Sequence, residues 1–276
     1  MRSFFVFIGD YGSGHNRRFD LNPRRVPMPI AILSALAEEQ DGLVHLLENA
    51  QQTRHAGRIF WTGKLHGKEV ICALSGIGKV AAATTAVALI ERFGAKAIVF
   101  TGVAGGLGDA VHVGHVVVAR QYVQHDMDAS PLFPRFEVPG YGRAVFDCDA
   151  ALSNALLQSV QACVQQQAGA WAAELGLGAP QVHEGLIVSG DRFVSGSEEA
   201  AQLRQGLEQA DLAPLAVEME GAAIAQVCAD YDLPFAAMRS ISDKADDAAH
   251  VDFPLFVQSI ASRYAQAVIE DLCKRL

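Results

Sequence analysis

Short apolar runs alternate with longer helical stretches along most of this chain, and this alternation restricts the fold more than any other feature. Residues 29–33, 97–100 and 235–239 are short and mainly apolar, which is typical of strands buried on both faces. Residues 80–92 are Ala-rich, and residues 256–268 carry an apolar stripe at helical spacing. This order predicts one α/β domain over residues 28–276, with a single mixed, mostly parallel sheet covered by helices.

Composition excludes several classes of protein for this chain of 276 residues. Hydrophobic residues make up 50% and charged residues 19%, which excludes an intrinsically disordered chain. The formal net charge of -9 argues against a nucleic acid or an anionic membrane as the main partner, because both attract clustered Lys and Arg. No apolar run reaches the roughly 18 residues of a membrane span.

The cysteines and the N-terminal residues indicate in which cellular compartment the protein is expected. Five cysteines are spread between Cys72 and Cys273, with no Cys-x-x-Cys pair and no zinc-like His spacing. A reducing compartment, the cytoplasm, and a metal-free protein are therefore expected. Residues 1–27 hold four arginines between Arg17 and Arg25 but lack the apolar core of a signal peptide. We predict that residues 1–27 are an irregular appendage outside the fold.

Polar residues follow the end of each predicted strand. In open α/β sheets, ligands bind beyond the carboxyl ends of the strands, so these segments are the expected binding site. They are rich in carboxylates and hydroxyls, and they comprise residues 34–39, 75–79, 101–106, 189–193, 218–220 and 240–246.

The glycine-rich segment 76–81 has the loose spacing of a dinucleotide-binding loop. An NAD-binding protein also needs an acidic residue about 20 positions on, but Phe100 and Thr101 stand there. A nucleotide-phosphate loop is excluded, because Val80 occupies the place of the magnesium-binding Ser or Thr. Two interpretations stay open: the glycines only form a tight turn, or the backbone near Gly78 closely approaches a neutral ligand.

Two pairs of glutamates are candidate functional residues. Glu38 and Glu39 lie in the first turn of a predicted helix, where carboxylates are common because they complement the helix dipole. Glu218 and Glu220 flank Met219 at a strand end, just before an apolar helix. Two carboxylates around a methionine suggest a pocket that binds hydroxyl groups beside an apolar wall, although a solvated cap is the alternative.

Three further features allow both a functional and a structural interpretation. Asp243 follows a buried strand and Ser242, but it also belongs to an acidic segment that could be a surface turn. His125 and Asp126 form a possible catalytic pair, but no nucleophile motif accompanies them. The Pro-rich residues 130–143 form either a lid or an ordinary loop.

Five segments together resemble one family. The chain is similar to the bacterial 5′-methylthioadenosine/S-adenosylhomocysteine nucleosidases of the purine nucleoside phosphorylase-like superfamily. The similarity runs from about Pro29 to the C-terminus, and it is carried by residues 75–83 (SGIGKVAAA), 101–106 (TGVAGG), 188–193 (VSGDRF), 216–220 (AVEME) and 239–243 (RSISD). The resemblance implies a nucleoside phosphorylase-like fold and hydrolysis of the bond between adenine N9 and a 5′-thio-substituted ribose, without a cofactor.

The resemblance also implies catalytic roles. Glu39 corresponds to the acid/base that deprotonates the attacking water, and Ser75 and Arg239 would help to hold that water. Asp243, with Ser242 beside it, would donate a proton to adenine N7. This chemistry suits these residue types, because adenine is a poor leaving group as an anion and an acid must neutralise it. Carboxylates near the sugar favour the positive charge that develops there.

The substrate-binding roles follow from the same resemblance. Glu220 would accept hydrogen bonds from the ribose hydroxyls, with Met219 packed against the sugar. Phe193 would stack on the base, whose edge the Val194 backbone would contact. Phe253 resembles a wall of the pocket for the 5′ substituent.

Several alternatives remain open at this stage. A phosphorylase needs a phosphate site, but residues 100–106 and 75–78 contain no basic residue, which favours water as the acceptor. Relatives that cleave 6-amino-6-deoxyfutalosine share nearly all of these motifs. The Pro-rich loop 130–143 stands where the family builds part of the 5′ pocket. The resemblance further implies a homodimer.

Overall fold

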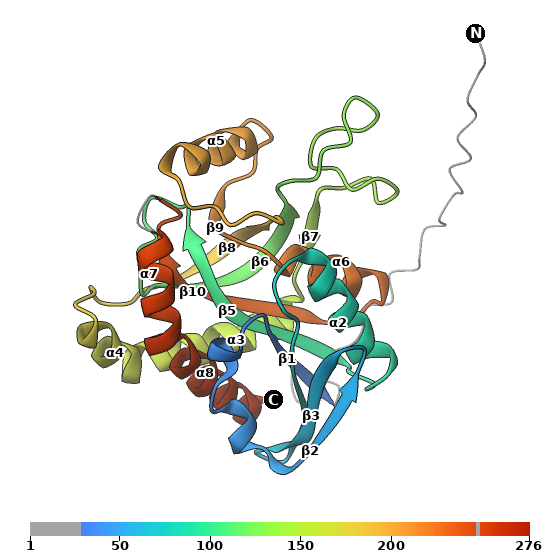
Figure 1. Cartoon of the computed structure of the whole chain (residues 1–276), viewed down its shortest axis with the longest axis vertical. Coiled ribbons are helices and arrows are strands. Elements are labelled where there is room, and N and C mark those ends of the chain that lie inside the picture. The colour runs from blue at the N-terminus through green and yellow to red at the C-terminus, as the bar shows by residue number, and fades with distance from the viewer. Residues whose placement is uncertain (1–28, 247–248) are drawn as a thin grey trace.

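The computed structural model describes residues 29–246 and 249–276 (Figure 1). The predicted appendage, residues 1–27, lies outside these residues. The strands are β1 (Ile30–Ser34), β2 (Glu48–His55), β3 (Arg58–Leu65), β4 (Lys68–Leu74), β5 (Ala97–Gly106), β6 (Val116–Gln124), β7 (Val145–Asp147), β8 (Val182–Ser189), β9 (Pro214–Glu218) and β10 (Phe235–Asp243). The α-helices are α1 (Ala37–Gln40), α2 (Lys79–Glu91), α3 (Ala150–Cys163), α4 (Gly169–Glu174), α5 (Ser197–Glu208), α6 (Gly221–Asp230), α7 (Ala249–Phe256) and α8 (Ser262–Arg275).

All ten strands belong to one mixed sheet, part of which closes on itself. β5 pairs with β9 and β10, β10 with β6, β6 with β8, and β8 with β9, so these five strands form a ring. β1, β4, β3 and β2 extend the sheet from β5. The predicted single-domain α/β fold with a mixed sheet is confirmed, although antiparallel pairings are as numerous as parallel ones among the described strands.

Helices cover both faces of the sheet (Figure 1). Buried residues of α2 and α6 share one hydrophobic core with β1, β5 and β10. Buried residues of α3 and α8 form a second core on the other face, where Tyr264, Val268 and Leu272 place the predicted C-terminal stripe inside the protein. No helix within the described residues is both long enough and apolar enough to cross a bilayer.

The region after β1 differs from the sequence prediction. Apolar residues between 36 and 47 predict one helix, but the structure has only the single turn of α1 followed by a 3₁₀ turn over Leu43–Leu46. Gly42 separates the two turns with a left-handed φ of 81°. β2 was not predicted, because this strand is mostly exposed and polar and has no apolar alternation.

β5 and β10 are longer than predicted, and this places the site. β5 extends to Gly106 and is buried at every position, so its segment 101–106 belongs to a strand rather than to a loop. β10 extends to Asp243 and pairs with β5 in parallel, with Asp243 opposite Gly105. The polar ends of these two strands therefore lie side by side at one edge of the ring.

Candidate active site

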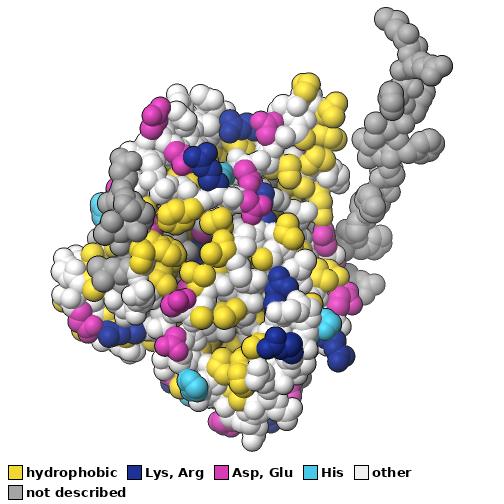
Figure 2. All heavy atoms as spheres, in the orientation of Figure 1, with side chains coloured by type: hydrophobic (Ala, Val, Ile, Leu, Met, Phe, Trp, Pro, Cys, Tyr) yellow, Lys and Arg dark blue, Asp and Glu magenta, His cyan; other side chains and the backbone are white. Residues whose placement is uncertain are grey.

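A cavity of about 480 Å³ opens at the carboxyl ends of β5, β9 and β10. Figure 2 shows hydrophobic side chains gathered on the face where β5 ends. Nine of the twelve predicted site residues line this cavity, which brings together segments more than 200 residues apart in sequence. They are Glu39, Phe193, Val194, Glu218, Met219, Glu220, Ser242, Asp243 and Phe253. Arg239 lies buried beneath the cavity, next to the carboxylates that line it.

Glu39 is held rigidly by backbone amides. Its Oε2 accepts hydrogen bonds from the amides of Ala35 and Leu36, each at 2.8 Å, and its Oε1 accepts one from Val103 at 3.0 Å. Burial raises the pKa of Glu39, and this effect outweighs the opposing effects of Arg239 and of the amides. A carboxylate with a raised pKa is a better proton acceptor near neutral pH than an exposed glutamate.

Arg239 is the buried cation of the site. Its guanidinium pairs with Glu218, lies 3.8 Å from an oxygen of Glu220, and packs over the ring of Phe100 with 3.8 Å to the ring centroid. It also touches Gly102, where a Cβ atom would lie 2.2 Å from Nη1 of Arg239. Buried charges need partners, and here carboxylates and an aromatic face supply them.

Glu218 is the structural carboxylate of this group. It accepts hydrogen bonds from the hydroxyl of Ser189, from the amides of Glu220 and Gly221, and from Arg239. With both of its oxygens occupied by protein donors, Glu218 fixes Arg239 rather than offering free acceptors to a ligand.

Glu220 has one oxygen bound by a backbone amide, whereas the other, Oε2, lies 3.8 Å from Nη2 of Arg239. Its Oε1 accepts a hydrogen bond from the amide of Gly78 at 2.8 Å, which explains how the predicted Gly78 contributes although it does not line the cavity. Burial and the neighbouring charge of Glu218 raise the pKa of Glu220 to about 8. The folded protein therefore binds the Glu220 proton more tightly than an exposed glutamate would.

Asp243 ends β10 and faces the glycines of β5. The hydroxyl of Ser242 donates to its Oδ2 at 2.8 Å, and the amide of Ala245 donates to its Oδ1 at 2.8 Å. A Cβ atom at Gly105 would lie 2.9 Å from Oδ1, so the close approach of the two strands requires glycine there. Within residues 29–246 and 249–276, no group of three or more His, Cys, Asp or Glu side chains could hold a metal ion.

The remaining lining is apolar. Phe193 and Phe253 make an edge-to-face contact with ring centroids 5.5 Å apart, and Met219 lines the same cavity. Phe193 is 43% exposed, whereas Val194 next to it is buried. The cavity therefore joins a carboxylate-rich part to an apolar part that suits a flat, neutral ring system.

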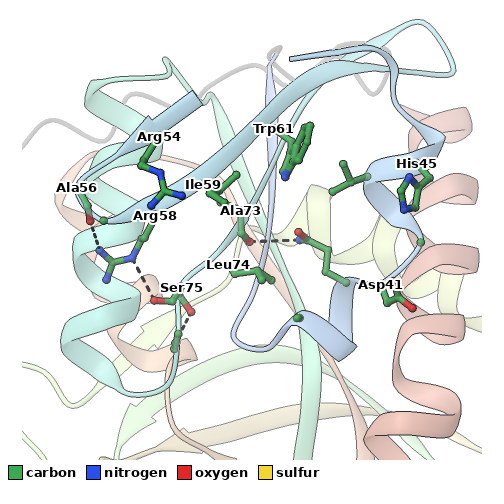
Figure 3. Close-up of a pocket in the computed structure, with 16 residues that line it drawn as sticks. Asp41, His45, Arg54, Ala56, Arg58, Ile59, Trp61, Ala73, Leu74 and Ser75 are labelled. Atoms are coloured by element: carbon green, nitrogen blue, oxygen red, sulfur yellow. Dashed lines mark hydrogen bonds between the residues drawn. The ribbon is translucent and has the colours of Figure 1, made fainter. Parts of the chain in front are cut away.

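Ser75 is the predicted catalytic residue that the structure does not bring to this cavity. It lines a second cavity of about 750 Å³, formed by β2, β3 and the segment after β1 (Figure 3). Its hydroxyl donates to the carbonyl of Gly76 at 2.7 Å, and Arg58 binds its carbonyl. Among the described residues, Asp41 is the only carboxylate that lines this larger cavity, which differs in this from the first cavity with its several acids.

Several supporting residues were missed from the sequence. The amides of Ala35, Leu36 and Val103 hold Glu39, and Phe100 packs on Arg239. Backbone donors carry no side-chain signal, and a phenylalanine in a buried strand is indistinguishable from an ordinary core residue. Ser189 lies inside the segment 188–193 that carried the family resemblance, so that motif was the available signal.

The sequence profile of the phosphorylase superfamily matches residues 29–274, which is nearly the whole described chain. The chain belongs to the phosphorylase superfamily. Solved structures place it beside the nucleosidases of this superfamily, so the family resemblance inferred from the sequence is confirmed, and the protein is an enzyme of this kind.

Three solved structures illustrate the relationship. The 5′-methylthioadenosine/S-adenosylhomocysteine nucleosidase of Neisseria meningitidis, in complex with methylthio-immucillin-A, is 35% identical, with 90% of this chain and 99% of that chain covered and a TM-score of 0.77. The nucleosidase of Colwellia psychrerythraea with adenine is 32% identical, with coverages of 90% and 95% and a TM-score of 0.79. A futalosine hydrolase of Helicobacter pylori is 32% identical, with coverages of 90% and 97% and a TM-score of 0.75.

Proposed function

We propose that this enzyme hydrolyses the N-glycosidic bond of 5′-methylthioadenosine and S-adenosylhomocysteine, releasing adenine and the 5′-thioribose product. The observation that carries the proposal is that one cavity combines Glu39, Glu220 and Asp243 with an apolar wall. Paired carboxylates around a scissile bond are the chemistry of glycoside cleavage. Nucleosidases at 30% identity or more that cover about nine-tenths of the chain support the same substrate class.

Departure of the base requires an acid. In the proposed mechanism Asp243, protonated in the substrate complex, donates its proton to adenine N7 as the C1′–N9 bond breaks, so that neutral adenine leaves. The hydroxyl of Ser242 and the amide of Ala245 fix the Asp243 carboxyl group, which keeps its proton directed at one position. Phe193 and Val194 would bind the base beside it.

Attack by water requires a base. Glu39 would accept a proton from the water as its oxygen bonds to C1′. The raised pKa of Glu39 suits this role, and its negative charge would also stabilise the positive charge that develops on the ribose. Arg239 would orient the water together with Glu39, because both groups lie against Gly102. Ser75 was expected to share this task, but it lines the other cavity, and the proposal does not use it.

Ribose binding falls to Glu220. Its carboxyl group has one oxygen fixed by Gly78 and is positioned to bind vicinal hydroxyls, with Met219 as the neighbouring apolar surface. Phe253 and Ile77 line the same cavity and would contact the apolar 5′ substituent.

Water rather than phosphate is the proposed acceptor. Arg and Lys side chains are common phosphate ligands in proteins. Arg192 is the only basic residue in the described lining of the cavity, and it pairs with Glu199 at 2.7 Å. Arg239 is already paired with Glu218.

The test is adenine release from 5′-methylthioadenosine in phosphate-free buffer, with S-adenosylhomocysteine measured in parallel. Release of one adenine per nucleoside, unchanged by added phosphate, is the expected result. Release that depends on phosphate would instead identify a phosphorylase.

6-Amino-6-deoxyfutalosine is a second candidate substrate. The observation that favours it is the similarity to the H. pylori futalosine hydrolase, which matches this chain as well as several of the other nucleosidases do. The same assay with this nucleoside, compared by kcat/KM, ranks the two candidates.

The proposed assembly is a homodimer in a reducing compartment, the cytoplasm. Three apolar residues of the α2 region are exposed: Ile77 by 58%, Val80 by 75% and Val87 by 36%. Exposed apolar residues that gather along α2 and just before it are typical of an interface, here with a second copy of the chain. All five cysteines are free thiols, as expected in a reducing compartment.

A further inference from the structure

Three charged residues outside the cavity form a compact cluster that the proposed mechanism does not use. The charged cluster consists of Lys79 at the start of α2, Asp126 just after β6, and Asp191 in the segment after β8. None of the three lines the substrate cavity. Lys79 and Asp191 nevertheless each lie within two residues of a side chain that lines it, Ile77 and Phe193 respectively.

Asp126 binds the other two members with its two oxygens. Its Oδ1 accepts a hydrogen bond from Nζ of Lys79 at 2.6 Å, and its Oδ2 accepts one from the backbone amide of Asp191 at 2.9 Å. Lys79 Nζ also donates to the side chain of Gln124 at 3.0 Å. Burial raises the pKa of Asp126, but the bonds from Lys79 and Asp191 outweigh this effect and hold it below its usual range.

Asp191 closes the cluster on α2. Its Oδ1 accepts a hydrogen bond from the backbone amide of Lys79 at 2.7 Å, and it approaches Gly78 so closely that a Cβ atom there would lie 3.1 Å away. The amide of that same Gly78 binds Glu220. The consecutive amides of Gly78 and Lys79, at the start of α2, therefore bind Glu220 and Asp191, respectively. Glu220 is the proposed ribose-binding carboxylate, and Asp191 lies two residues before Phe193.

The cluster thus links the two halves of the cavity. The segment 192–194 supplies the wall for the base, whereas Glu220 supplies the contact to the ribose. Within the described residues, the hydrogen bonds of the charged cluster tie Asp191, next to this segment, to the start of α2 and to Asp126.

We propose that Asp126, acting through Lys79 and Asp191, is a positioning residue that sets the distance between the base-binding segment and the ribose carboxylate. This inference rests on the proposed function of the cavity. It gives Asp126, of the His125-Asp126 pair, a positioning role instead of a catalytic one. Bound nucleoside would contact segment 192–194 equally before and during bond cleavage. Loss of the cluster is therefore expected to weaken substrate binding and to leave the rate of the chemical step nearly unchanged.

The test compares Asp126→Ala with Asp128→Ala. Asp128 is the matched control, because among the described residues its carboxylate hydrogen-bonds to the nearby Ser130, through the amide at 3.0 Å and through the side chain, and not to the charged cluster. Asp126→Ala is expected to raise KM for 5′-methylthioadenosine about tenfold with kcat changed less than about threefold. Hydrogen exchange of the ligand-free protein is expected to become about tenfold faster at the amides of residues 190–194 but not elsewhere. Asp128→Ala is expected to change neither quantity.

Other outcomes overturn the inference. Unchanged KM, or unchanged exchange in segment 190–194, means that the cluster does not position this segment. Faster exchange throughout the protein means a merely structural role, and an equal loss of kcat and kcat/KM means that the cluster acts on the chemical step rather than on binding. Lys79→Met tests the same bonds if Asp126→Ala does not fold, and Lys79→Arg is expected to restore KM. The exchange measurement needs no turnover, so a wild-type protein that releases no adenine contradicts the proposed function alone.

Discussion

At the scale of single residues, the site is organised by how many donors each carboxylate already has. Both oxygens of Glu218 accept hydrogen bonds from protein donors, Glu39 is held by three amides, and within the described residues Glu220 accepts a hydrogen bond from the amide of Gly78. Burial raises the pKa of Glu39, and burial together with the charge of Glu218 raises the pKa of Glu220 to about 8. The carboxylates therefore differ in hydrogen bonding and in task, although their side chains are chemically alike.

The two proposed proton-transfer residues are the first to test. Glu39→Gln and Asp243→Asn keep the shape of each side chain but replace the titratable carboxyl group with an amide, so kcat is expected to fall by about 10²- to 10⁴-fold. Adenine release measures the effect, and circular dichroism shows that the fold persists. Glu38→Gln is the control, because Glu38 is the exposed neighbour of Glu39 on α1. Retention of most of the activity in either active-site variant would refute the assigned role.

Glu220 predicts a pH dependence of stability. Its pKa is about 8 in the folded protein against an ordinary value of 4.5, so the folded state binds the proton more tightly than the unfolded chain. The contribution of Glu220 to the free energy of unfolding is fully present below about pH 4.5 and is lost as the pH rises through about 8. Glu220→Gln is expected to remove this loss.

Urea unfolding at about pH 5 and about pH 8 measures the difference. The variant should gain stability relative to the wild type at the higher pH. Glu69→Gln is the control, because Glu69 is an exposed residue near the start of β4. Equal pH profiles for Glu220→Gln and the wild type would contradict the raised pKa.

At the scale of elements, the glycines of β5 decide how closely β10 and α1 can approach. A Cβ atom at Gly102 would lie 2.2 Å from Arg239 Nη1 and 2.6 Å from Glu39 Oε1. Neither neighbour can move freely, because amides hold Glu39 and Glu218 holds Arg239. The chemistry of the site therefore depends on a strand position that has no side chain.

Gly102→Ala is expected to reduce stability by about 1–3 kcal/mol through overpacking and to displace both Glu39 and Arg239. Adenine release should fall with it, and thermal unfolding measures the stability. Gly169→Ala is the matched control, because Gly169 has helical backbone angles of −60° and −38° and nothing within 4 Å of its Cβ position. We expect it to increase stability by about 0.5–1 kcal/mol. Full activity in Gly102→Ala would show that the site tolerates the added methyl group.

The same elements show what the sequence could and could not reveal. Buried strands such as β1, β5 and β10 were predictable because their apolar runs have no other stable environment. The polar edge strand β2 was not, because edge strands need no buried face, and the helix expected over residues 36–47 was interrupted at Gly42. Strand order was equally hidden: nothing in segments 116–124 and 182–189 indicates that β6 and β8 pair and close a ring.

At the scale of the whole molecule, the order of the motifs along the chain indicated where the site lies. The closed ring of strands determines which residues line it. Residues from 39 to 253 meet in one cavity because the ring brings the ends of β5, β9 and β10 together. Ser75 lies in a motif that ends near the cavity, yet it faces the other side of its turn. Spacing along a chain predicts neighbours in sequence, but it does not predict on which side of a turn each side chain points.

The proposed dimer gives the last prediction. Val80 is 75% exposed and lies two residues after Gly78, whose amide holds Glu220, so an interface on α2 would adjoin the ribose site. Val80→Glu places a charge in that interface, and burial of an unpaired charge is costly. Analytical ultracentrifugation is expected to find dimers for the wild type and mainly monomers for Val80→Glu. Ala170→Glu adds the same charge on an exposed position of α4 and should leave the dimer intact. If the Val80→Glu protein sediments as a dimer, the interface does not lie on α2.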